Sequence, residues 1–114
     1  MLTKDEILNA QDTETQTIKV KEWGGEVTIA VMSGFARDKF EASIVGKNGT
    51  SNMSNIRSKL VASSIVDEKG DLMFTDADII KLGKKSSIAL DRIFTAAQSL
   101  NKITDDDVDE LAKN

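Results

Sequence analysis

The chain has 114 residues, with fifteen basic and nineteen acidic side chains and a formal net charge of −4. This length fits one domain with a single modest core, and we expect residues 1–114 to form one domain. The chain contains no histidine and no cysteine, which excludes Ser-His and Cys-His nucleophilic catalysis, disulfide bonds and the usual zinc sites. These absences predict a protein that is not an enzyme and that acts by binding another protein.

The charge distribution argues against nucleic-acid binding, because such proteins usually carry a basic stripe that neutralises phosphates. The densest basic cluster here is short and consists of Lys81, Lys84 and Lys85. The opening residues MLTKDEILNA lack the basic and long apolar regions of a secretory signal. No apolar run approaches the roughly 20 residues of a membrane span. We therefore expect a cytoplasmic protein that binds neither nucleic acid nor membrane.

Residues 1–16 are expected to form a short helix followed by a polar linker. Thr3 and Glu6 have the spacing of a capping box, in which each side chain binds the other residue's backbone N–H. Two apolar residues, Ile7 and Leu8, follow directly. A helix of this length is marginal in water unless it packs on something.

Residues 17–32 are expected to form a β-hairpin. Two runs of alternating β-branched residues flank the pair Gly24-Gly25, a pattern typical of two strands joined by a tight turn. The single tryptophan, Trp23, precedes this pair. Its expected role is to cover one end of the core, and a partly exposed Trp23 can also anchor a partner, since tryptophan is enriched at interfaces.

Residues 33–114 are expected to be helical, with a flexible loop at 46–55. Apolar spacing predicts helices near 35–46, 55–66, 76–82, 87–101 and 104–112, with an extended segment at 72–74. Gly83 is expected just past a helix end, in the left-handed conformation. The fold class that follows is α+β: an N-terminal β-hairpin followed by a bundle of short helices, mostly helical.

Two acidic clusters resemble cation sites but are better explained as helix caps and a turn. Twelve residues from Asp67 to Asp78 have the length of an EF-hand loop, yet Lys69 occupies the third ligand position and Leu72 replaces the turn glycine. The acids at 105–109 lie in a first helical turn, where they complement the helix dipole. We expect no metal site and no cofactor.

The order of these features resembles a known family. The segments LTKDEILNAQD, KEWGGEV and MSGFARDKFEASI, followed by the long stretch from IRSKLVASSIV to ITDDDVDELAKN, look like the tail assembly chaperones of long-tailed (siphovirus-type) bacteriophages. The likeness covers nearly the whole chain, and it lies in the ordered series rather than in one diagnostic motif.

This resemblance implies a protein of virion assembly in the host cytoplasm. Such chaperones bind the tape measure protein, a long and poorly soluble helical chain, and help tail-tube subunits polymerise around it. The sequence then corresponds to the short form of the family, is not retained in the virion, and can form homo-oligomers. The alternative is a structural minor tail or tail completion protein that does remain in the virion.

An apolar helical client needs exposed apolar faces on short, weakly held elements. The first helix, the hairpin turn and the last helix meet this requirement, since each is a short piece that can cover either its own core or a partner. The expected partner-binding residues are Ile7, Leu8, Trp23, Val108 and Leu111.

Overall fold

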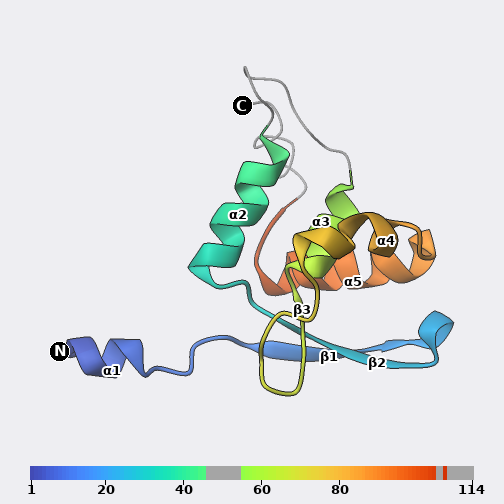
Figure 1. The fold of residues 1–114 in the computed structure, drawn as a ribbon. Helices are drawn as coiled ribbons and strands as arrows, with labels where there is room; N and C mark the ends of the chain where they lie inside the picture. Colours follow the sequence, from blue (N-terminus) through green and yellow to red (C-terminus); the bar gives the residue numbers. More distant parts are fainter. Residues whose placement is uncertain (46–54, 105–106, 108–114) are drawn as a thin grey trace.

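The computed structural model describes residues 1–45, 55–104 and 107 (Figure 1). Most of the loop expected at 46–55, and the terminal helix apart from Asp107, lie outside these described residues. Within them, no helix is long and apolar enough to cross a membrane. In chain order the elements are α1 (Lys4–Leu8), β1 (Thr15–Val20), the 3-10 turn η1 (Lys21–Trp23), β2 (Gly25–Ala30), α2 (Gly34–Ile44), α3 (Ile56–Ala62), β3 (Ile65–Val66), the 3-10 turn η3 (Asp76–Asp78), α4 (Ile79–Gly83) and α5 (Ser87–Leu100).

The expected α+β class is confirmed, and so is the hairpin. β1 and β2 pair antiparallel from Thr15 opposite Ala30 to Val20 opposite Gly25. The first strand begins two residues earlier than expected. The turn is made by η1 and by Gly24, whose φ of 73° is left-handed, a conformation that costs glycine no steric energy.

A third strand replaces the end of the helix expected at 55–66, so that boundary was wrong. α3 stops at Ala62, and β3 pairs antiparallel with β2, with Ile65 opposite Ile29. Ser63 and Ser64 separate the two elements, and their hydroxyl groups donate to carbonyl oxygens four residues earlier. The β-branched Ile65 and Val66 then bury fully in the sheet, where such side chains pack well.

The core lies between the sheet and the helices that cover one of its sides (Figure 1). The side chains of Val20 and Ile29 from the sheet, Leu60 from α3 and Ile93 from α5 are all fully buried. Each such burial stabilises the fold by about 1.5–3 kcal/mol. The stripe expected on α5 is confirmed, since Leu90, Ile93 and Ala97 are buried.

The predicted capping hydrogen bonds are confirmed. Thr3 with Glu6 and Thr75 with Asp78 form capping boxes, and the Ser86 hydroxyl accepts from the N–H of Ala89 at the start of α5. Thr104 and Asp107 exchange the same pair of hydrogen bonds at 2.9 and 3.0 Å.

The prediction for Gly83 was wrong. It is the last residue of α4 and its φ is not positive. A Cβ at this position would lie 3.3 Å from the Ser58 hydroxyl oxygen and 3.4 Å from the Asn55 amide oxygen. Gly83 therefore allows α4 to approach the start of α3, instead of ending a helix in the left-handed conformation.

Candidate protein-binding surface

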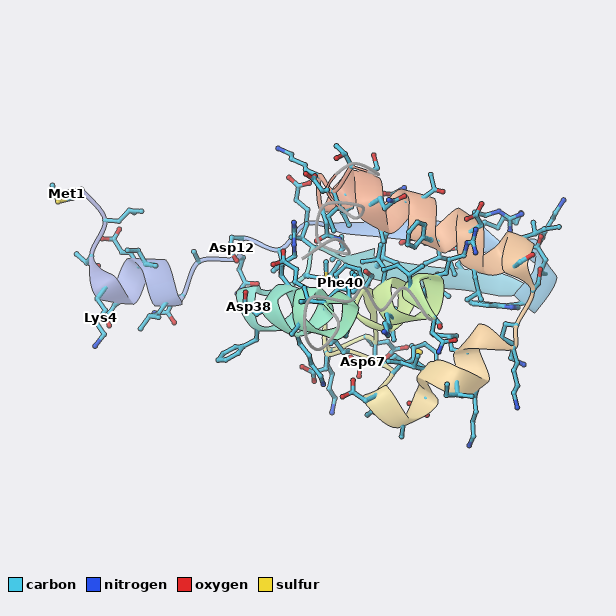
Figure 2. The ribbon with its side chains drawn as sticks, turned by 90° about the horizontal axis from the view of Figure 1, so that it is seen from above. Met1, Lys4, Asp12, Asp38, Phe40 and Asp67 are labelled. Carbon is cyan, nitrogen blue, oxygen red and sulfur yellow. The ribbon has the colours of Figure 1, made fainter. Side chains whose placement is uncertain are left out.

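The helix α1 stands away from the rest of the molecule. Figures 1 and 2 show it beyond one end of the hairpin, joined by an extended linker. None of its residues is buried, and the side chains of Ile7 and Leu8 are 57% and 70% exposed. The neighbouring Leu2 is also exposed. α1 thus presents apolar side chains that pack on nothing within the described chain.

The capping box is what gives this isolated helix its start. The Thr3 hydroxyl accepts from the Glu6 N–H at 3.2 Å, and the Glu6 carboxylate accepts from the Thr3 N–H at 3.1 Å. Caps of this kind contribute about 1 kcal/mol, whereas a five-residue helix lacks the length to be stable in water alone. α1 therefore needs a surface to pack on.

Trp23 lies at the other end of the hairpin, in the turn η1. Its ring is half-buried and packs against the edge of the core. Both expected roles are compatible with this position, because one part of the indole ring covers the core while the rest faces solvent. Trp23 is held there by its neighbour Glu22, whose carboxylate accepts two hydrogen bonds from the Arg92 guanidinium group of α5.

The ion pair also affects the ionisation of both groups. The hydrogen bond from Arg92 is the main reason that the pKa of Glu22 lies below its ordinary value. The same bond raises the pKa of Arg92. Both changes favour the charged forms, which are the forms that make the ion pair.

Beside Trp23 is an apolar hollow of about 370 Å³. Its apolar lining comes from Trp23, Phe74 and Leu82, of which Phe74 is half-buried and Leu82 buried. Its polar lining is Asp78, Lys81 and Lys85. We call this site the Trp23 hollow, defined by these six residues. An aromatic base with a mainly basic rim suits an apolar segment that carries acidic side chains.

The sequence did not predict that Phe74 lies beside Trp23. The expected extended segment at 72–74 is confirmed in part by a β-bridge between Val66 and Leu72. A residue directly before the capping residue Thr75 often packs across a helix start, which is the signal that could have placed Phe74 beside α4. Its approach to Trp23, about fifty positions away, depends on the tertiary fold.

A second residue missed by the sequence is Phe35, whose side chain is 92% exposed. It lies in the first turn of α2, off the stripe of Ala36, Phe40 and Ile44 that faces the core. That offset is readable from helical periodicity. A single exposed ring of this kind is common on protein surfaces and does not by itself mark a binding site.

The expected partner-binding residues thus fall into separate patches. Ile7 and Leu8 lie on α1, and Trp23 lies at the opposite end of the hairpin (Figure 1). Val108 and Leu111 lie outside the described residues. The structure does not bring the first two residues to Trp23 within one molecule.

The acidic turn at 67–71 has the structural role expected for it. The Asp67 carboxylate accepts from the N–H groups of Lys69 and Asp71 at 2.9 and 3.1 Å. In the part of the chain that is described, no three acidic side chains gather as metal ligands would.

The Asp107 carboxylate accepts a hydrogen bond from the backbone N–H of Thr104, and this bond lowers the pKa of Asp107.

Comparison with known proteins adds evidence on the fold. No family model matches the sequence, and no curated protein matches it. Among solved structures, the bacteriophage HK97 tail assembly chaperone is similar, with a TM-score of 0.60. The match covers 84% of this chain and 90% of that chain, at 17% sequence identity. It confirms that this chain has the fold implied by the sequence resemblance.

Proposed function

We propose that this chain is a phage tail assembly chaperone that binds the tape measure protein and assists tail-tube assembly without joining the mature virion. The observation that carries the proposal is the fold shared with the HK97 tail assembly chaperone over most of both chains. Its place of action is the host cytoplasm, and its role is binding rather than catalysis.

The exposed apolar surfaces support this role. A long helical client presents apolar stripes that must be shielded until the tail tube surrounds it, and shielding requires apolar side chains on the chaperone. α1 offers Ile7 and Leu8, and the hairpin turn offers Trp23 beside Phe74. Val108 and Leu111 remain expected contact residues, on the strength of their apolar spacing in the sequence alone.

The shape of these sites favours helices as ligands. The Trp23 hollow opens to solvent and has two lysines at its rim. An amphipathic helix places apolar side chains at positions i and i+4 on one face, which fits an aromatic base with charged margins better than a small polar ligand does. The tail tube protein is a second partner, because the client is handed over during tube polymerisation.

Co-expression with the tape measure protein of the same phage tests the proposal. We expect the tape measure protein to become soluble and to copurify with the chain. The double variant Leu8→Asp, Trp23→Ala should no longer solubilise the tape measure protein. The control Ile88→Ala, at an exposed position on α5, should still do so. A tape measure protein that stays insoluble with the wild-type chain would overturn the proposal.

A further inference from the structure

The helix α1 and the Trp23 hollow are two uncovered surfaces of one chain that complement each other. α1 carries Ile7 and Leu8 exposed, with Asp5 and Glu6 in its first turn. The hollow has an aromatic base and the exposed lysines Lys81 and Lys85 at its rim. The apolar residues and acids of α1 thus match the apolar base and the ammonium groups of the hollow in chemical character.

The rim has positive charge to offer a ligand. Within the described residues neither Lys81 nor Lys85 takes part in an ion pair. The one acid of the lining, Asp78, already accepts hydrogen bonds from the backbone and hydroxyl of Thr75. The Asp78 Oδ2 is thus used in the capping box of η3, and the two ammonium groups outnumber this single carboxylate at the rim.

The two surfaces lie too far apart to meet comfortably within one molecule. Trp23 belongs to the hairpin turn, and both views show α1 beyond the opposite end of the hairpin (Figures 1 and 2). Six residues, 9–14, join α1 to β1 and span at most about 20 Å. The six residues of β1 cover about the same length, so α1 could reach its own hollow only through a fully stretched linker. A second copy meets the hollow without this constraint.

We propose that, in the free protein, α1 of one copy docks in the Trp23 hollow of a second copy, with Ile7 and Leu8 against Trp23 and Phe74 and the acids of α1 facing Lys81 and Lys85. The exchange supplies the packing surface that a five-residue helix lacks, in the manner of an element swapped between identical chains. It does not require the proposed function. If that function holds, the client competes with α1 for the hollow.

Trans-complementation between two surface variants tests the exchange. One variant, Leu8→Asp, has a damaged helix and an intact hollow. The other, K81E with K85E, has an intact helix and a reversed rim. All three positions are exposed, and circular dichroism checks that both variants fold.

Sedimentation velocity gives the readout. We expect the wild-type chain to self-associate with rising concentration, each variant alone to stay monomeric, and their mixture to form a complex that contains both. A monomeric wild type, self-association of Leu8→Asp, or a mixture that remains monomeric would each overturn the proposal. All of these measurements use the chain alone, without the tape measure protein. A failure of the helix exchange can therefore be told apart from a failure of the proposed function.

Site-specific cross-linking identifies the occupant directly, because the chain has no native cysteine. Differently tagged Leu8→Cys and Lys81→Cys chains are mixed and treated with a short bis-maleimide. We expect a cross-linked product with both tags. In the control, the Lys81→Cys chain is exchanged for a Ser99→Cys chain, whose cysteine lies at the exposed far end of α5. We expect no cross-linked product from this pair. Equal yields from the two pairs would contradict docking in the hollow.

Discussion

The guanidinium group of Arg92 donates two hydrogen bonds to the carboxylate of Glu22, one of them 3.0 Å from Nη2 to Oε2. The two residues are 70 positions apart. Their bond fixes the turn of an N-terminal hairpin on the last described helix, and Trp23 is the next residue in that turn. The position of the Trp23 hollow therefore depends on a contact between the hairpin turn and α5.

Replacing Arg92 by methionine should make stability less sensitive to acid. Arg92 lowers the pKa of Glu22 from its ordinary value of about 4.5. A carboxyl group whose pKa is lowered by folding stabilises the fold above its unfolded pKa, and it loses that contribution as pH falls through the folded value. Wild type and Arg92→Met should therefore differ most in urea midpoint above pH 4.5 and converge at lower pH. The more exposed pair of Arg57 with Asp91 is the control, and Arg57→Met should have a smaller effect.

Replacing Gly24 by alanine should destabilise the hairpin by about 1–2 kcal/mol, because a Cβ is strained at its positive φ. The adjacent Gly25 has no positive φ, and neither glycine has a heavy atom within 4 Å of an added Cβ. Gly25→Ala is thus a matched control, expected to be neutral or stabilising by about 0.5 kcal/mol. Urea unfolding measures both variants. Equal losses at the two positions would show that the turn is not fixed by its backbone conformation.

Truncating Ile93 to alanine should cost about 2–5 kcal/mol, because it leaves a cavity among fully buried side chains. Ile88 lies on the same helix but is 67% exposed, and Ile88→Ala should change the free energy of unfolding by no more than about 0.5 kcal/mol. Chemical denaturation followed by circular dichroism compares the two. A large loss at Ile88 would mean that a partner or a second copy covers that face.

Asn101 joins the end of α5 to the chain that leaves β2. Its amide oxygen accepts from the Met32 N–H at 2.8 Å, and its amide nitrogen donates to the Ala97 carbonyl at 2.8 Å. Asn101→Ala removes both bonds and leaves the N–H of the buried Met32 unpaired, which should cost about 1–3 kcal/mol. Asn101→Asp keeps the acceptor for Met32 and should cost less. Thermal unfolding at neutral pH compares the stability of the two variants. Equal losses of stability would mean that the bond to the Ala97 carbonyl, and not the bond from Met32, accounts for the loss.

Much of the fold was predictable because its signals are local. The capping pairs of Thr3, Thr75 and Thr104 involve residues three positions apart, and the buried stripe of α5 follows helical periodicity. β3 was not predictable in this way. Ile65 and Val66 continue an apolar pattern that also suits a helix, and their pairing with β2 depends on contacts across more than thirty positions.

The candidate surface was predictable only in its separate parts. Ile7, Leu8 and Trp23 were expected to be exposed because each lies in a short or turn-like segment, and all three side chains are at least partly exposed. The hollow was not, since Phe74 and Lys81 reach Trp23 only when α4 packs beside the hairpin turn. The role of Gly83 was not predictable for the same reason. It leaves room for Ser58 of another helix, and this approach exists only in the folded chain.

A tail assembly chaperone acts during tail assembly and then leaves the particle, as we propose for this chain. Quantitative mass spectrometry of infected cells and of purified virions from the same phage measures this most directly. We expect the chain to be abundant in the cell lysate together with the tape measure protein, and absent from virions that contain the tape measure protein. A fixed copy number of the chain in every purified virion would contradict the claim and would identify a structural tail protein instead.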